Sequence, residues 1–378
     1  MLRFFISWSF CILISSFASA GTVDTDEVDR RIKALMNKTD LTGLAVAIIE
    51  DGDISFAQGY GETLKGSGDK VTADTVFRWA SISKSMAAAT ILSLSEDGYI
   101  GLTSPAIAHA PSLNLPKSQN IVTVEDILTH QTGIVRNAYD TRVEDGYPAK
   151  DIRSSLESLP RICEPGECHT YQNVAFDAAA EMVETAIELP YKSVVNERFF
   201  IPLGMSTASI TLDGLTRSKS WAKPHQKDGR VIDEVKPTYY RLPAAAGVNS
   251  SVADLGKWVM VQMDENHSVL SQLQQEALQT PRVSTPRENR IMRRFYHALK
   301  DAHYGLGWRI YDYEGHKVIG HRGAVQGYRA SVLFDPELKS GVAVMWNSSH
   351  SRPNGLNLEI MDQIYDRPKR DWMRLTQG

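Results

Sequence analysis

The sequence predicts an α+β fold in which an antiparallel sheet, built from both ends of the chain and flanked by helices, carries a large and mainly helical insertion. Short apolar strand patterns bounded by turn residues cluster near the two ends. Helical periodicity dominates between about 81 and 297. The length of 378 residues suits one domain over 21–378, with an α/β lobe of about 21–80 plus 298–378 and a helical lobe of about 81–297.

The first twenty residues have the pattern of a secretory signal peptide. Arg3 supplies the positive start, 4–17 the apolar core, and 18–20 a small-residue cleavage site. The apolar run is short for a membrane span, and no second such run follows. We therefore expect a periplasmic or secreted protein without a stable membrane anchor after cleavage.

The sheet is expected from strand patterns near both ends. Residues 44–50 and 54–60 flank Asp51-Gly52, which is a strong hairpin signal. The C-terminal strand candidates are 304–313, 316–321, 328–334 and 342–346, separated by turns at 314–315, 324–327 and 335–341. A terminal helix over 356–365 has apolar residues at helical spacing and covers one face of this meander.

The helical region begins with the apolar segment 86–94, which predicts a long helix that runs to Gly98. Further helices are expected over 125–128, 176–187, 191–199, 252–263 and 270–278. A cleft between the sheet and these helices is the natural place for a site that binds a small molecule.

Charge and cysteine content exclude several classes of function. The formal net charge is −4 and there is no basic stripe, which argues against a nucleic-acid partner. In an oxidising compartment Cys163 and Cys168 can close a disulfide across a short turn, although two free thiols remain an alternative. Only His169 is adjacent and there is no second cysteine pair, so we expect no metal and no cofactor.

Ser81 and Lys84 form the strongest chemical pattern, because a serine hydroxyl needs a base and a lysine one helical turn later is placed to act on it. The same spacing occurs at 67–70 and 220–223, but both lie in polar segments that cannot bury a reactive pair. The alternative for Ser81 is a simple helix N-cap.

Tyr171 and Asn173 form the only Tyr-x-Asn string in the chain. A lysine ammonium nearby favours a phenolate, so the tyrosine can carry a proton to or from a leaving group, and the asparagine can bind a substrate amide. The alternative is a turn before a helix, with Asn173 as its cap.

The third element is His321 with Gly323, at the end of an apolar strand where a glycine lets a substrate backbone lie close to the strand edge. The string Lys339-Ser340-Gly341 is a rival, but it occupies a hairpin turn whose residues are explained by turn chemistry.

The order of these three elements resembles the penicillin-recognising serine hydrolases, which include class C β-lactamases, D-alanyl-D-alanine carboxypeptidases and related esterases. The resemblance spans nearly the whole chain. Strings that add to it are 128–133, 202–205, 246–251 followed by Asp254 and Trp258, and 304–308. It implies a β-lactamase/transpeptidase-like fold and a small-molecule or peptide substrate.

The resemblance also implies a role for each site residue. Ser81 is the acylated nucleophile, Lys84 and Tyr171 act jointly as acid and base, Asn173 binds the acyl amide, His321 stands for the third-motif cation, and the backbone N–H groups of Ser81 and Ala324 form the oxyanion hole.

The third motif departs from the class C pattern of lysine and threonine. A histidine with a pKa near 6.5 is only partly charged at neutral pH, so support for a substrate carboxylate is weaker. Arg322 restores it only if it faces the cleft, whereas strand alternation turns it away from His321. The expected function is acyl transfer to a β-lactam, a D-amino-acid peptide or an ester. The alternatives are an esterase with little β-lactam turnover and a penicillin-binding receptor that acylates and stalls.

Overall fold

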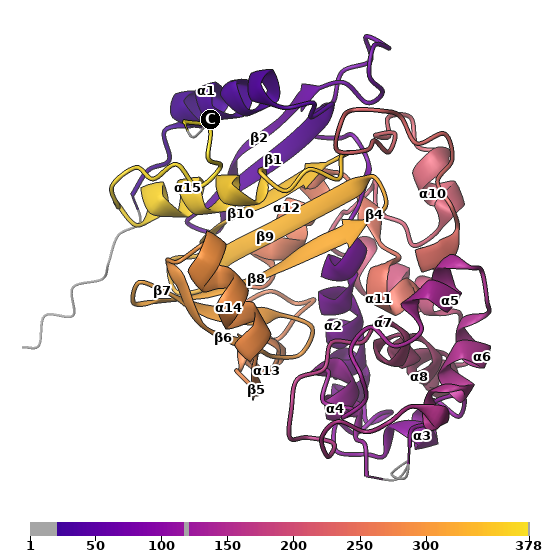
Figure 1. Cartoon of the computed structure of the whole chain (residues 1–378). Helices are drawn as coiled ribbons and strands as arrows, with labels where there is room; N and C mark the ends of the chain where they lie inside the picture. Colours follow the sequence, from indigo (N-terminus) through magenta and orange to yellow (C-terminus); the bar gives the residue numbers. More distant parts are fainter. Residues whose placement is uncertain (1–20, 117–120, 377–378) are drawn as a thin grey trace, which may run out of the picture.

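An eight-stranded antiparallel sheet forms the centre of the molecule in the computed structural model, which describes residues 21–116 and 121–376 (Figure 1). The predicted signal peptide, 1–20, lies outside the described residues. The strand order is β2-β1-β10-β9-β8-β7-β6-β5, so the first and last parts of the chain meet where β1 pairs with β10. The strands of this sheet are β1 Gly43–Glu50, β2 Asp53–Gly61, β5 Val283–Ser284, β6 Leu299–Tyr304, β7 Arg309–Tyr313, β8 His316–Val325, β9 Tyr328–Asp335 and β10 Ser340–Trp346.

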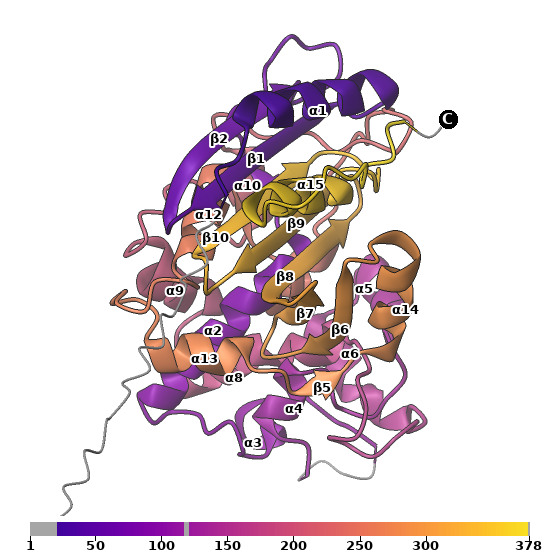
Figure 2. The same ribbon diagram turned by 90° about the vertical axis from the view of Figure 1, so that its left-hand side faces the viewer.

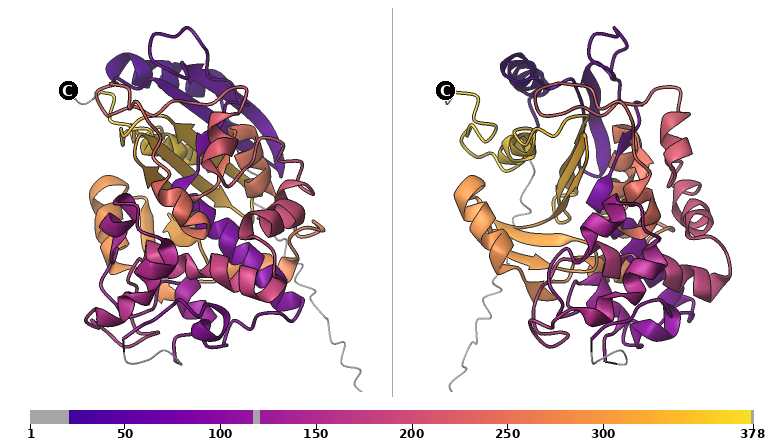
Figure 3. Two further views of the ribbon diagram at one scale, coloured as in Figure 1. Left: turned by 90° about the vertical axis from the view of Figure 1, so that its right-hand side faces the viewer. Right: turned by 45° about the vertical axis from the view of Figure 1, so that its right-hand side comes forward.

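Helices cover both faces of the sheet, as the views in Figures 2 and 3 show. One face carries α1, α14 and α15, and the other faces α2, α12 and the rest of the helical region. The helices are α1 Thr25–Lys38, α2 Ser83–Glu96, α3 Ala106–His109, α4 Val124–Leu128, α5 Asp140–Glu144, α6 Ala149–Ser154, α7 Asn173–Phe176, α8 Ala178–Ile187, α9 Tyr191–Val195, α10 Leu212–Thr216, α11 Pro243–Ala246, α12 Val252–Met260, α13 Gln272–Gln279, α14 Pro286–Phe295 and α15 Asn354–Ile364. Within the described residues no helix is both long and apolar enough to span a bilayer.

Strand β1 shows why the sheet is central. Ala45 and Ala47 belong to the apolar core on the helical side, whereas Val46 and Ile48 belong to the core beneath α1 and α15. Successive side chains of a strand point to opposite faces, so a strand covered on both faces needs apolar residues at every position.

Two predicted strand boundaries are wrong. The candidate over 304–313 is two strands, β6 and β7, joined by a turn in which Gly307 has a φ of +72°. A Cβ on Gly307 would lie 2.5 Å from the Lys84 carbonyl oxygen, so this turn is pressed against α2 and requires glycine. The predicted turn at 324–327 is shorter than expected, because β8 continues to Val325.

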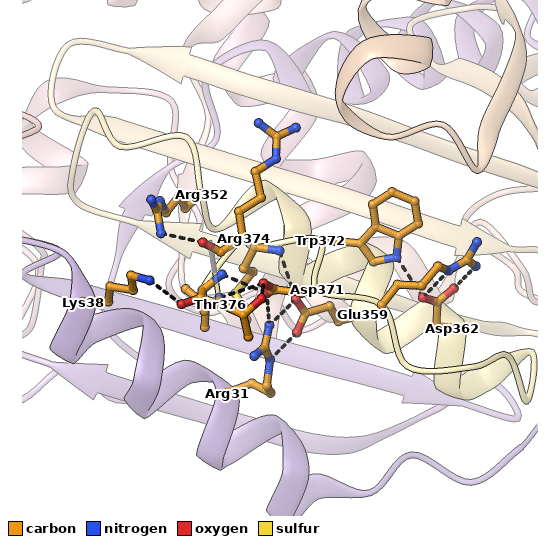
Figure 4. Close-up of polar contacts among 12 residues, drawn as sticks. Arg31, Lys38, Arg352, Glu359, Asp362, Asp371, Trp372, Arg374 and Thr376 are labelled. Atoms are coloured by element: carbon orange, nitrogen blue, oxygen red, sulfur yellow. Dashed lines mark hydrogen bonds and ion pairs between the residues drawn. The ribbon is translucent and has the colours of Figure 1, made fainter. Parts of the chain in front are cut away.

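The C-terminal segment is fastened to α1 and α15 by polar contacts (Figure 4). The guanidinium of Arg31 on α1 donates to both carboxylate oxygens of Glu359 at 2.7 Å and to Asp371 at 2.6 Å. The indole of Trp372 donates to Asp362 at 2.8 Å. These bonds attach the C-terminal segment to the two helices on the sheet face that lies away from the helical region.

A short two-stranded sheet positions the start of α2. Its strands are β3 Phe77–Arg78 and β4 Asn249–Ser250, and they pair antiparallel. The indole of Trp79 donates to the Ser250 hydroxyl at 2.7 Å. The chain entering α2 is therefore fixed to a segment about 170 residues away in sequence.

Candidate active site

Ser81 lies in a 3₁₀ turn, Ala80–Ile82, directly before α2. Trp79 N–H donates to the Val248 oxygen at 2.9 Å, and Val248 N–H donates to the Ser83 hydroxyl at 3.0 Å. The residue before Ser81 has a φ of +49°, a conformation that non-glycine residues adopt only where the surroundings enforce it. The turn therefore holds the serine in one place.

The alternative roles for this spacing are not supported. Ser81 does not cap α2, because the N-cap is Ile82 and no side-chain capping bond is present. Of the two competing serines, Ser67 donates to the Leu64 oxygen at 2.8 Å in an exposed turn. Ser220 shares a hydrogen bond of 2.9 Å with the Thr75 hydroxyl.

Lys84 is completely buried, and its ammonium group contacts three acceptors. Its Nζ lies 3.3 Å from Ser81 Oγ, 2.8 Å from Asn173 Oδ1 and 3.0 Å from the Ala245 oxygen. A lysine ammonium has three N–H donors, so the acceptors satisfy all of them. The buried charge is thereby fixed against the serine.

Both the oxygen and the nitrogen of the Asn173 side-chain amide form hydrogen bonds. Its Oδ1 accepts from Lys84, while its Nδ2 donates to Asp140 Oδ2 at 2.8 Å. Burial raises the pKa of Asp140, and the hydrogen bond from Asn173 and the charge of Lys84 oppose this rise. Asn173 is the first residue of α7 rather than its cap, which is Gln172. Asn173 thus orients Lys84, in addition to the substrate contact expected from sequence.

Tyr171 is buried among rings and positive charges. Its ring centroid lies 4.2 Å from that of His130, 4.8 Å from Lys84 Nζ and 5.7 Å from the guanidinium carbon of Arg309. The ring of His321 is 6.4 Å away. The three predicted elements are therefore brought together in one site.

His321 differs from the expectation in position and in charge. It lies inside β8 rather than at the end of a strand. Its Nε2 lies 3.1 Å from the Tyr304 hydroxyl, and its Nδ1 lies 3.0 Å from the Arg322 oxygen. Burial, followed by the charges of Arg309 and Lys84, lowers the pKa of His321 well below its ordinary value. The imidazole is therefore neutral, not partly charged, at neutral pH.

The positive charge nearest to Tyr171 on the sheet comes from Arg309 on β7. Burial alone would lower the pKa of Arg309, but the charge of Glu288 and of nearby tyrosines raises it. Glu288 lies 3.5 Å from Arg309 and also pairs with Arg322. Although burial opposes it, these two cations hold the pKa of Glu288 down to about 2. Arg322 therefore turns away from His321, as strand alternation predicts.

Gly323 lies against the turn that carries Ser81, a contact that the sequence did not predict. A Cβ at this position would lie 2.0 Å from the Trp79 oxygen and 3.2 Å from the Ala80 side chain. This is a close approach between β8 and the turn that carries Ser81. The contact holds β8 against the 3₁₀ turn, and Ala324, which we expect to supply the second N–H group of the oxyanion hole, directly follows Gly323 and is exposed.

The sequence matches the Beta-lactamase family over residues 28–364, which is most of the chain. The chain belongs to the Beta-lactamase family. These are serine hydrolases, so the resemblance recognised from the motifs is confirmed. The predicted fold class is also confirmed, because solved structures of this fold superpose on most of the chain.

Particular relatives show how broad the similarity is. The unguisins hydrolase ungD of Aspergillus violaceofuscus (strain CBS 115571) is 27% identical over 93% of this chain and 66% of that protein. The chain thus spans about two thirds of the length of the curated relatives it matches. The octameric penicillin-binding protein homologue from Pyrococcus abyssi has a TM-score of 0.82 at 26% identity, covering 91% of this chain and 78% of that one. The D-alanine carboxypeptidase AmpC from Burkholderia cenocepacia has a TM-score of 0.71 at 21% identity, covering 89% and 98%, and shares the fold.

In this family member a disulfide joins Cys163 and Cys168 just before Tyr171. The loop that it closes lies against the segment after α4, because Gly166 N–H donates to the Gln131 oxygen at 2.9 Å. A Cβ on Gly133 would lie 2.3 Å from the Cys163 oxygen. The cross-link therefore stiffens the chain that enters Tyr171.

Several site residues were missed from the sequence. Asp140 and Arg309 belong to no short motif, and only three-dimensional contacts reveal them. His130 lies in a string that contributed to the family resemblance, but its contact with Tyr171 was not foreseen. Burial, followed by the charges of His169 and Lys84, lowers the pKa of His130 well below its ordinary value.

Proposed function

We propose that this chain is an exported serine hydrolase that cleaves its substrate through an acyl-enzyme on Ser81. The observation that carries the proposal is the buried Lys84 ammonium, held 3.3 Å from Ser81 Oγ and 4.8 Å from the Tyr171 ring centroid. A hydroxyl nucleophile, a cation and a phenol in contact are the groups that acyl transfer needs.

In the first step Ser81 attacks the carbonyl carbon and loses its proton to the Lys84–Tyr171 pair. The pair can accept this proton only in the form that has already lost one, and we assign the role to Lys84 and Tyr171 jointly, with Tyr171 carrying the proton onward. The oxyanion forms between the N–H groups of Ser81 and Ala324. Losing one such donor costs on the order of 100- to 1000-fold in rate.

Tyr171 then returns the proton to the leaving group, and water attacks the acyl-enzyme by the reverse route. Arg309 places a fixed positive charge on this side of the site. It takes the part assigned to the third-motif cation, because His321 is neutral. Asn173 keeps Lys84 in place through both steps.

The substrate classes that we propose are a D-amino-acid peptide, an ester or a β-lactam. Hydrolysis is supported by the names of relatives, which include a hydrolase of unguisins, and a D-alanine carboxypeptidase shares the fold. The neutral His321 is the specific observation that favours a second candidate, an esterase with little β-lactam turnover, since it weakens recognition of the β-lactam carboxylate. Export follows from the signal pattern and agrees with a disulfide-bonded chain.

Substrate choice is tested by steady-state kinetics with three probes: 4-nitrophenyl butyrate, a chromogenic cephalosporin and a peptide ending in D-alanyl-D-alanine. Turnover of any of the three probes supports the serine hydrolase, the probe with the highest kcat/KM identifies the substrate class, and an ester rate far above that of the cephalosporin favours the second candidate. A single burst without turnover indicates a receptor that acylates and stalls. No reaction with any probe, and no covalent adduct, contradicts the proposed function.

A further inference from the structure

Arg78 is a buried cation that the reaction described above does not use. It lies on β3, three residues before Ser81, and its side chain is 3% exposed. Its guanidinium carbon stacks 4.2 Å above the ring centroid of Tyr240. Its Nε and Nη2 atoms are buried without a hydrogen-bond partner, and no carboxylate of the described residues forms an ion pair with it.

A guanidinium in this state is unfavourable. A buried charge is normally paired and its N–H groups normally have acceptors, because water no longer solvates them. Stacking on Tyr240 compensates only in part, since it uses the face of the guanidinium and leaves its edge donors unmatched. The missing partner is therefore an anion with two acceptor atoms.

The unpartnered donors form a recognisable fork. The Nε–H and one Nη2–H of arginine point to the same side and match the two oxygens of one carboxylate. Arg31 uses this pair in the same chain, where Nε and Nη2 both bind Glu359 at 2.7 Å (Figure 4). Arg78 presents the equivalent pair without its carboxylate.

A cavity of about 410 Å³ lies against Arg78 and is lined also by Tyr239, Val325 and Gln326. Val325 and Gln326 directly follow Ala324 in the chain, so the cavity lies beside the end of β8 that carries this proposed oxyanion-hole residue. Tyr171 is not among its lining residues. The cavity therefore does not extend to Tyr171, the residue that serves the leaving group.

The other charges of the cavity do not neutralise Arg78. Glu144, Glu234 and Lys236 line it, but all three are exposed and solvent screens them. Nε and Nη2 are covered, so binding requires the guanidinium to turn towards the cavity. No hydrogen bond to a described residue holds the Arg78 guanidinium in its present orientation, so this rotation breaks none.

We propose that Arg78 is the anion-binding residue of an acyl-side subsite and that the substrate carries a carboxylate on its acyl group. The assignment rests on the proposed function, because it concerns the same reacting carbonyl. The carboxylate of the acyl group pairs with the Arg78 fork while Ser81 attacks the ester or amide carbonyl.

The test compares two esters of similar size, mono-4-nitrophenyl glutarate, which has a terminal carboxylate, and neutral 4-nitrophenyl butyrate. Arg78→Met is expected to lower the ratio of kcat/KM for the charged over the neutral ester by about 10- to 100-fold, because a charge-assisted bidentate contact is lost. Arg78→Lys keeps the charge but lacks the paired donors. Its ratio of kcat/KM is expected to lie between those of the wild type and Arg78→Met. Lys219→Met, a matched loss of one exposed positive charge outside the cavity, changes the ratio by less than about threefold.

An unchanged ratio in Arg78→Met overturns the proposal. So does an equal fall for both esters accompanied by a lower thermal midpoint, because that result indicates a structural role. If the wild type cleaves neither ester, the proposed function fails separately and calorimetric titration with glutarate decides the subsite. Saturable binding that Arg78→Met loses supports it, and no binding to the wild type contradicts it.

Discussion

Replacing Gly323 by alanine tests whether the contact between β8 and the serine-bearing turn sets the geometry of the site. The added Cβ would lie 2.0 Å from the Trp79 oxygen, and real Cβ atoms essentially never come within 3.0 Å of another heavy atom. The turn and β8 must therefore separate by about 1 Å, a displacement that in an active site lowers the rate by about 100-fold. The overpacked contact also destabilises the fold by about 1–3 kcal/mol.

The control is Gly320→Ala on the same strand, where the added Cβ would lie 2.4 Å from the Val332 oxygen on β9. This variant suffers a similar clash without touching the turn that carries Ser81. The assay is kcat/KM for 4-nitrophenyl butyrate at a temperature where both variants are folded by circular dichroism. We expect Gly323→Ala to lose about 100-fold and Gly320→Ala to stay close to wild type. Wild-type kcat/KM in Gly323→Ala would refute the reasoning.

Two further predictions concern stability. Burial lowers the pKa values of His130 and His321 well below the ordinary value and that of His169 to about 3. At pH values between these pKa values and 6.5, the unfolded chain takes up protons that the folded chain does not. The free energy of unfolding should therefore fall as the pH drops below about 6.5. Urea midpoints that stay constant from pH 7.5 to 5 would contradict this. Arg31→Met leaves the Glu359 carboxylate, 9% exposed, without its bidentate partner and should lower stability by about 1–3 kcal/mol, whereas Arg31→Met combined with Glu359→Met should recover part of the loss. A double variant no more stable than the single one would show that the buried carboxylate is not the cause.

Much of the fold follows from local patterns, whereas the prediction fails where packing depends on distant parts of the chain. The hairpin of β1 and β2 was predicted because Asp51-Gly52 fits the turn, with φ values of +51° and +87°. Helix α1 was not foreseen, although Val28, Ile32 and Leu35 have helical spacing and are buried. The sequence of α1 is mostly polar. Its packing depends on α15 and the C-terminal segment, which lie at the other end of the chain.

The site residues divide in the same way into those that local spacing predicts and those that depend on distant contacts. Ser81 and Lys84 could be found because one helical turn relates them, so that spacing reports geometry directly. The partner of Asn173 is Asp140, from a different helix, and no rule of spacing connects the two. The neutrality of His321 depends on burial and on charges from other elements, which a pKa taken from the sequence omits.

The central claim is that Ser81 becomes acylated, and intact mass spectrometry over time after mixing with a penicillin or an activated ester tests it most directly. The wild type should gain the mass of one acyl group, stably or transiently. Ser81→Ala should gain none, while its circular dichroism stays that of the wild type. Full labelling of Ser81→Ala would contradict the assignment of the nucleophile and the mechanism built on it.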